Sequence, residues 1–280
     1  MSRLLPEFSV LGLTRILVLS DQLQAEHIPV GFASSPVFAT TAWSGADALA
    51  LQPALQAVLA QLPATRWQKI ELYLADQHVH LMRLPAMTQG LQAFDWSGQD
   101  QQAYARAMLM QTYGEAARSW PFRLQDVCQP QDSLLVAIPV LQTLDWTALL
   151  RPHALQWQVQ AYACALWANT RLPKTGTVLT AEPQMLRLLQ LEQGRIMHVA
   201  GLATSLQAVE TMADWVLRER TLLGVQASAC YWVTEPGNHR ALNTGHRLKQ
   251  ALAGQVNWQL LPSARPLTQL RQEVSHVAAA

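Results

Sequence analysis

The sequence predicts a two-lobed α/β protein built on mixed β-sheets. The same order of elements, a meander of three short β-prone runs followed by a helix and a further strand, occurs once in each half of the chain. Pro173 and the Lys174-Thr175-Gly176 turn separate the two halves. The 280 residues suffice for one bilobed domain or for two modest ones.

The first copy of this pattern occupies the N-terminal part of the chain. Its three strands are expected at Ile16–Ser20, Glu26–Gly31 and Val37–Trp43. Residues 46–62 place apolar side chains at helical spacing and predict an amphipathic helix, in which Pro53 marks a late start or a kink. Lys69–Leu74 is the next strand, and His78–Leu84 is expected to form a hairpin with it.

The second copy follows Pro173. Its meander is expected at Gly176–Ala181, Met185–Leu191 and Arg195–Val199. Residues 203–223 predict a long helix with Gly224 as its C-cap. The remaining elements are a strand at Ser228–Thr234, a helix near Arg240–Ala253 and a strand at Val256–Leu261.

Further α/β elements lie between the two copies. A helix at Gln99–Gly114 precedes an antiparallel strand pair, Arg118–Val127 with Ser133–Val140. Beyond this pair we expect a helix at Thr143–Leu150, a strand at Gln156–Tyr162 and a helix at Ala163–Arg171. We therefore expect a first lobe at residues 1–172, with an inserted small subdomain at about 85–155, and a second lobe at residues 173–280.

The composition excludes two broad classes of protein. Hydrophobic residues make up 50% of the chain and charged residues 14%, so the chain is too apolar to be intrinsically disordered. The net charge of +1 provides no overall field to attract nucleic acid or an acidic membrane surface. We therefore expect no nucleic-acid partner.

The cysteines and the N-terminus indicate a cytoplasmic protein. Cys128, Cys164 and Cys230 are odd in number and far apart, which argues against a disulfide framework or a zinc site. The first 20 residues are interrupted by Pro6 and Glu7 and do not form a signal peptide. A run of about twenty apolar residues, which a membrane span requires, is also missing, so we expect no direct membrane insertion.

Three segments and the duplicated order carry a resemblance. The segments are Tyr73–His80, Tyr104–Trp120, and Val178–Pro183 with the strand that follows it. With these segments the chain resembles the bilobed actin-like (ASKHA) fold shared by actin and sugar kinases. Within that fold it is similar to the actin-like assembly proteins of type IV pili (PilM) and to the cytoplasmic domain of type II secretion protein L. The fit covers most of the chain in order and spacing.

The resemblance implies a cytoplasmic scaffold that binds the cytoplasmic segment of an inner-membrane pilus or secretion protein and contacts the assembly ATPase. It implies a location peripheral to the inner membrane, reached through partners. A homodimer is a further expectation. Membrane-anchored relatives continue into a transmembrane helix and a periplasmic domain after this region, and we expect neither in this chain.

An actin-like ATPase holds the phosphates of ATP with two hairpin turns that contain glycine, because backbone N–H groups must approach the phosphates closely. The corresponding turns here, Ser20–Leu23 and Thr180–Gln184, contain no glycine, and Pro183 lacks an N–H donor. We therefore expect a degenerate nucleotide site, no cofactor and no enzymatic activity. Asp21 and Glu182 are either vestigial metal-binding carboxylates or ordinary turn residues. The alternative is an active ATPase or a sugar-kinase-like enzyme of the same fold.

Other candidate sites are weaker. His78 and His80 share one face of an expected strand, but no third metal ligand has suitable spacing, so we expect no metal site. No nucleophile motif or pair of acid–base residues predicts a catalytic site. Phe94 and Trp96 lie on a polar loop that belongs to no expected element, so they either anchor a binding partner or fill the cleft between the lobes.

Overall fold

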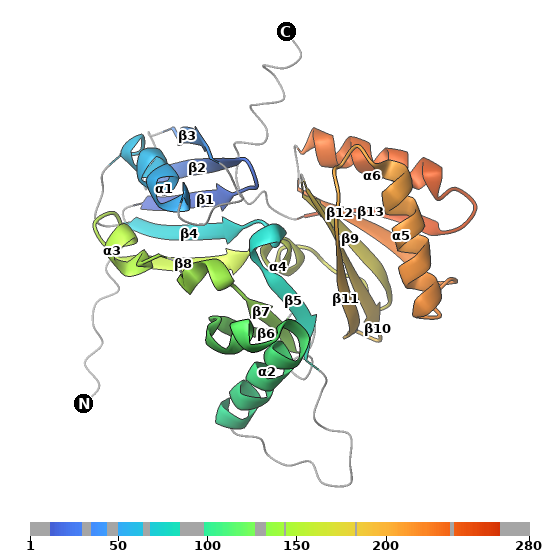
Figure 1. Cartoon of the computed structure of the whole chain (residues 1–280). Helices are drawn as coiled ribbons and strands as arrows, with labels where there is room; N and C mark the ends of the chain where they lie inside the picture. Colours follow the sequence, from blue (N-terminus) through green and yellow to red (C-terminus); the bar gives the residue numbers. More distant parts are fainter. Residues whose placement is uncertain are drawn as a thin grey trace, which may run out of the picture.

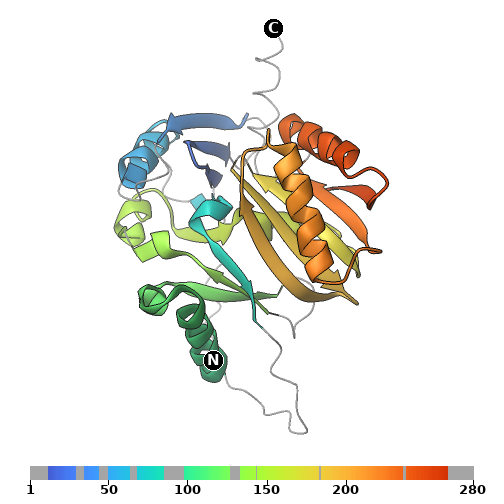
Figure 2. The same ribbon diagram turned by 45° about the vertical axis from the view of Figure 1, so that its right-hand side comes forward.

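The computed structural model describes residues 12–29, 35–43, 50–63, 68–84, 98–126, 133–142, 144–182, 184–235 and 238–263. These residues form two five-stranded sheets and one three-stranded sheet. The two large sheets lie side by side, and the small sheet lies at one end of the first, as two views of the ribbon agree (Figures 1 and 2). The protein is therefore a mixed α/β structure, as predicted.

The first sheet has the strand order β3-β2-β1-β4-β8. Its strands are β1 (Gly12–Val18), β2 (Gln22–Pro29), β3 (Val37–Ala42), β4 (Gln68–Leu74) and β8 (Gln156–Ala161). The first three strands form the predicted antiparallel meander, and β4 and β8 run parallel to β1. Helix α1 (Leu51–Ala60) contacts β2 and β3. Pro53 lies in its first turn, where the missing N–H has no helical partner to lose.

The second sheet repeats this arrangement in the order β11-β10-β9-β12-β13. Its strands are β9 (Gly176–Glu182), β10 (Met185–Glu192), β11 (Arg195–Ala203), β12 (Ala229–Thr234) and β13 (Asn257–Pro262), and its helices are α5 (Val209–Leu222) and α6 (His239–Ala251). Helix α5 begins at Val209 and not at 203, because β11 continues to Ala203 and Thr204 bonds to the β9–β10 turn. Gly224 follows α5 with a φ of 67°, as predicted for its C-cap. No helix in the described part of the chain is both long and apolar enough to cross a bilayer.

The small sheet has the order β5-β7-β6 and packs against helix α2 (Gly98–Tyr113) and the 3-10 helix η3 (Glu115–Ser119). Its strands are β5 (His80–Arg83), β6 (Phe122–Asp126) and β7 (Ser133–Ala137). The antiparallel pair β6–β7 is confirmed. The predicted hairpin of β4 with residues 78–84 is wrong, since the 3-10 helix η2 (Asp76–His78) redirects the chain and β5 pairs with β7.

One hydrophobic cluster spans both lobes, and a second cluster, which includes Leu188, Met212 and Trp232, lies within the second lobe. Helix α4 (Tyr162–Ala168) lies between the two large sheets, and its first six residues are all buried. A single apolar cluster contains α4, Leu72 of the first sheet and Val178 and Val233 of the second. Trp167 donates its indole N–H to Thr180 Oγ1 at 2.8 Å, across the boundary between the lobes. Helix α3 (Trp146–Leu150) also packs in this cluster, whereas the sequence places it in the inserted subdomain.

Candidate functional site at the cleft between the lobes

A cavity of about 420 Å³ lies where the hairpin turns of the two lobes face each other. It is lined by Asp21, Gln184, Ala203, Thr204, Ser205 and Arg240. Asp21 comes from the β1–β2 turn of the first lobe, and the other five residues come from the second lobe. Opposite charges, one carboxylate and one guanidinium, therefore line a cavity whose remaining side chains are neutral.

Trp43 donates two hydrogen bonds to the β1–β2 turn. The N–H of Leu19 donates to the Gln22 carbonyl at 3.0 Å and closes the turn. The backbone N–H of Trp43 donates to the Asp21 carbonyl at 3.0 Å, and its indole N–H donates to the Leu19 carbonyl at 2.9 Å. These bonds fix the backbone beneath Asp21 and leave its carboxylate exposed in the cavity.

The second-lobe wall is built by two connections. The N–H of Thr204 donates to the Gln184 carbonyl at 3.0 Å, which ties the segment after β11 to the β9–β10 turn. Asn238 caps helix α6 by accepting the N–H of Ala241 at 3.0 Å, and this fixes the first helical turn, which carries Arg240. The wall thus carries Thr204, Ser205 and Arg240.

The backbone of this cavity differs from a phosphate cradle. Among the described residues, a positive φ occurs at Gln193 and at five glycines, Gly114, Gly176, Gly194, Gly224 and Gly254. None of these six residues lines the cavity. A concave row of N–H groups around a phosphate generally needs such left-handed positions. The degenerate nucleotide site stays a prediction.

The structure brings only one of the two predicted turn carboxylates to the cavity. Asp21 lines it, whereas Glu182 is buried at the end of β9 and does not. Glu235 is a second buried carboxylate at the same end of the sheet, because β12 runs parallel to β9 beside it. No group of three His, Cys, Asp or Glu residues suited to a metal occurs in the described ranges.

His78 and His80 are not brought together. His78 belongs to η2, where its ring lies 5.4 Å from that of Trp43, and His80 opens β5, where its ring stacks on Trp120 at 4.7 Å. Burial lowers the pKa of both histidines, and the positive charge of Arg187 lowers that of His80 further. Each imidazole is therefore neutral near pH 7 and packs against an aromatic ring.

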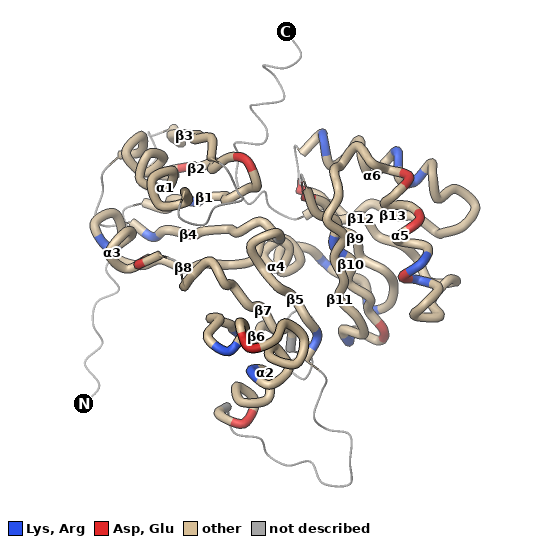
Figure 3. The backbone as a smooth tube through the Cα atoms, viewed as in Figure 1, with Lys and Arg blue, Asp and Glu red and all other residues tan. Residues whose placement is uncertain are grey.

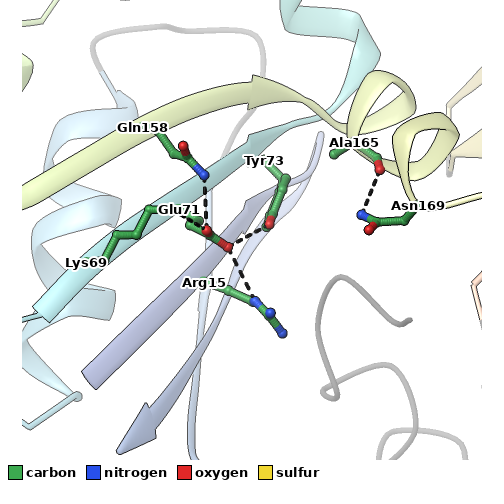
Figure 4. A network of polar contacts seen from close by, with 7 residues as sticks. All are labelled: Arg15, Lys69, Glu71, Tyr73, Gln158, Ala165 and Asn169. Atoms are coloured by element: carbon green, nitrogen blue, oxygen red, sulfur yellow. Dashed lines mark hydrogen bonds and ion pairs between the residues drawn. The ribbon is translucent and has the colours of Figure 1, made fainter. Parts of the chain in front are cut away.

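A second polar network lies on the first sheet and is centred on Glu71 of β4 (Figure 4). Its carboxylate accepts hydrogen bonds from Lys69 Nζ and Tyr73 Oη at 2.8 Å each and from Gln158 Nε2 at 3.0 Å. Arg15 Nε lies 3.5 Å from the same carboxylate. Burial would raise the pKa of Glu71, but the bonds from Lys69 and Tyr73 and the charges of Lys69 and Arg15 hold it below its usual value. A carboxylate with this many donors is a poor proton acceptor, so the network cross-links three strands.

A further set of contacts joins the small sheet to the second lobe. Arg187 of β10 donates to the Val79 carbonyl at 3.0 Å, and Arg83 of β5 donates to the Met197 carbonyl of β11 at 3.2 Å. The Arg83 bond connects the edge strands β5 and β11, and the Arg187 bond runs from the interior strand β10 to the residue before β5. The small sheet is thereby held against the second lobe.

Sequence reasoning missed Thr204, Ser205 and Arg240 as cavity residues. Loops that follow parallel strands gather at one edge of a sheet. Because Arg240 follows β12 closely, this rule could have placed it near the predicted turns. The predicted partner-binding residues Phe94 and Trp96 lie outside the described residues.

No family model matches the chain, and no curated protein matches its sequence. Solved structures match its fold. A protein with an actin-like ATPase fold from Bacteroides thetaiotaomicron has a TM-score of 0.57 at 12% identity and covers 91% of this chain and 94% of its own. The PilM–PilN type IV pilus biogenesis complex matches with a TM-score of 0.58 at 12% identity, over 93% of this chain and 94% of the matched chain.

The cytoplasmic domain of EpsL, an inner-membrane component of the type II secretion system of Vibrio cholerae, has a TM-score of 0.53 at 11% identity. The match covers 96% of this chain and 95% of that domain. At these identities the matches establish fold. The chain therefore has the actin-like fold, and its predicted likeness to PilM and to the cytoplasmic domain of a type II secretion protein L is confirmed at that level.

Proposed function

We propose that this protein is a non-catalytic, actin-like scaffold of a type IV pilus or type II secretion assembly. It would bind the cytoplasmic segment of an inner-membrane component and would contact the assembly ATPase. It would act in the cytoplasm, at the inner membrane through its partners. Homodimerisation is compatible with this role and is not required for it.

The observation that carries the proposal is the combination of fold and cleft. The fold is shared over most of the chain with PilM in its complex with PilN and with the cytoplasmic domain of EpsL. The cleft between the lobes lacks left-handed residues where an actin-like ATPase needs them, among the residues that line its cavity. A binding role without nucleotide hydrolysis accounts for both features.

Affinity capture tests the binding role. The full chain is used as bait in solubilised membranes of the source bacterium, and a synthetic peptide covering the cytoplasmic segment of the captured protein is then titrated against it. We expect Trp96→Ala to weaken the peptide complex by about 2 kcal/mol while the melting temperature stays nearly unchanged. The matched control is Leu222→Ala, an exposed site on α5, which should leave affinity unchanged. A large loss of stability in Trp96→Ala with unchanged affinity would contradict the role of this loop.

Calorimetry with Mg-ATP tests the alternative of an active ATPase, in which the carboxylate of Asp21 in the cavity would help to hold the metal ion. A micromolar dissociation constant corresponds to a binding free energy of about −8 kcal/mol. We expect no heat of binding at that affinity and no phosphate release. Micromolar binding that is abolished in Asp21→Ala would establish a nucleotide site and overturn the non-catalytic role.

A further inference from the structure

The cavity between the lobes carries opposite charges on its two sides. Asp21 lies in the β1–β2 turn of the first lobe, Arg240 lies in the first turn of α6 in the second lobe, and both residues are exposed. In Figure 3 the β1–β2 turn is red and the start of α6 is blue, on the sides of the two lobes that face each other. Among the described residues, neither side chain has a hydrogen-bonding or ion-pair partner. Two uncompensated charges of opposite sign therefore face one space.

The fold keeps these two charges apart. Helix α4 packs with Leu72 of the first sheet and with Val178 of the second in one apolar cluster, and the Trp167 indole donates to Thr180 across the boundary. A direct ion pair between the two walls would require the lobes to shift against this close-packed contact. The charges are thus available to a ligand and not to each other.

The position of Arg240 is unfavourable for the helix that carries it. The N–H groups at the start of a helix give that end a partial positive charge, so its first turn favours Asp or Glu. Helix α6 has no acidic residue there, and Arg240 adds a second positive charge. A local rule that is broken without a compensating contact is expected at functional positions. A bound carboxylate would supply the compensation.

The rest of the lining suits the backbone of a peptide. Gln184 and Ser205 are exposed, and Thr204 is partly exposed. Ser205 Oγ accepts the N–H of Gln207 at 3.3 Å, which leaves its O–H able to donate to a ligand. Amide and hydroxyl groups pair with both the N–H and the C=O of a peptide unit. The volume of about 420 Å³ lies within the range of roughly 300–1,000 Å³ that is typical of ligand sites.

We propose that this cavity binds an extended peptide segment of a partner protein that carries one Lys or Arg and one Asp or Glu. The basic side chain contacts Asp21, and the acidic one contacts Arg240, whose guanidinium can donate two parallel hydrogen bonds to a carboxylate. A ligand with charges of only one sign would leave Asp21 or Arg240 unpaired or repelled. The inference rests on the proposed binding role and adds the chemistry of the bound segment and its location.

Selection from a phage library of random short peptides on the purified full chain tests the proposal. We expect the enriched sequences to contain a basic and an acidic residue at a constant spacing. Calorimetry with an enriched peptide then measures affinity. Asp21→Asn and Arg240→Gln should each weaken binding about tenfold, because each removes one charged contact.

Substitutions in the peptide assign the contacts. Replacing its basic residue by Gln should weaken binding to the wild type about tenfold and should change binding to Asp21→Asn little, since that contact is already lost. The acidic residue of the peptide and Arg240→Gln form the second such cycle. Asp214→Asn on α5 and Arg247→Gln on α6 are the matched controls: both residues are exposed and lie outside the cavity lining, so affinity should stay unchanged.

Arg240→Glu separates a binding role from a structural one. It should abolish peptide binding and raise the melting temperature, because Glu suits the first turn of α6. A lower melting temperature would show that Arg240 stabilises the second lobe, and it would overturn the proposal.

A selection without enriched sequences, or with sequences that carry only one sign of charge, would overturn the proposal. So would peptides that bind the Asp21→Asn/Arg240→Gln double variant as tightly as the wild type. These results would not decide the adaptor role, since affinity capture can still identify an inner-membrane partner that binds elsewhere. If capture fails while selected peptides bind the cavity, the site stands and the adaptor role does not.

Discussion

The two large sheets follow the same path but differ in side-chain chemistry. Each has three antiparallel strands and two parallel ones, in equivalent order. The central strand β9 is buried at all seven positions, whereas β1 is buried at five, with Leu13 and Arg15 partly exposed. Strand order is set by the turns and crossovers, whereas the exposure of each face depends on what packs against it. A duplicated fold therefore does not imply a duplicated site.

The arginines of the two lobes illustrate this difference. Arg15 on β1 lies beside the Glu71 carboxylate and keeps a quarter of its side chain exposed. Arg220 on α5 is 1% exposed, and its described partners are neutral: Thr177 Oγ1 at 2.7 Å and the carbonyls of Gln226 and Ser228 at 2.8 and 2.6 Å. In the second lobe, three hydrogen bonds to neutral acceptors offset the cost of burying this guanidinium.

The largest effect is expected from a substitution in α4, the helix that packs against both lobes. Trp167→Ala deletes a fully buried indole of α4 and should cost about 3–5 kcal/mol of unfolding free energy. Chemical denaturation measures the loss, and we expect one transition for both lobes. Thr180→Val, which removes only the acceptor of the indole N–H, should cost about 1–3 kcal/mol. A Trp167→Ala protein of wild-type stability would show that the lobes do not share a core.

The two arginines provide the next test. Arg220→Met leaves the buried Thr177 hydroxyl and the partly buried carbonyls of Gln226 and Ser228 without their donor and should cost about 3 kcal/mol. Arg15→Met removes a partly exposed ion pair and should cost less than about 1 kcal/mol. Urea denaturation of both variants measures the difference. Equal losses would contradict the argument from burial.

Glu71→Gln tests whether the ionised carboxylate of Glu71 stabilises the first sheet. The pKa of Glu71 is held below its reference value of 4.5, so its ionised form stabilises the fold above that pH, and this stabilisation is lost as pH falls through the folded-state pKa. We expect the variant to be about 1–2 kcal/mol less stable at neutral pH and as stable as the wild type in strong acid. Denaturation curves across this range measure the difference, and a difference independent of pH would refute the assignment.

The smallest expected effect concerns His78. Burial lowers its pKa from 6.5 more than its bond with the Leu19 backbone raises it. The folded protein thus holds this imidazole neutral, and the associated stability is lost as pH falls below 6.5 toward the folded-state pKa. His78→Gln should flatten the decline of melting temperature in this window, compared with the wild type. His80 and His27, whose pKa values are also lowered, account for the remaining slope.

The strands and their order within each meander could be predicted from β-prone runs and turn residues, as Val37–Ala42 and Met185–Glu192 show. Residues 78–84 were misassigned because pairing partners are not encoded locally: β5 pairs with β7, about 50 residues later in the chain. The cavity required the same non-local information. Asp21 and Arg240 carry no mutual signal along the sequence, and only the fold places them around one space.

The buried helix α4 fixes the spacing between the two lobes. Separating the lobes would expose Trp167 and Val233 to water, and it would break the bond from Trp167 to Thr180. A segment that touches both lobes at once therefore meets a preset spacing, and little of its binding free energy is consumed in closing the lobes.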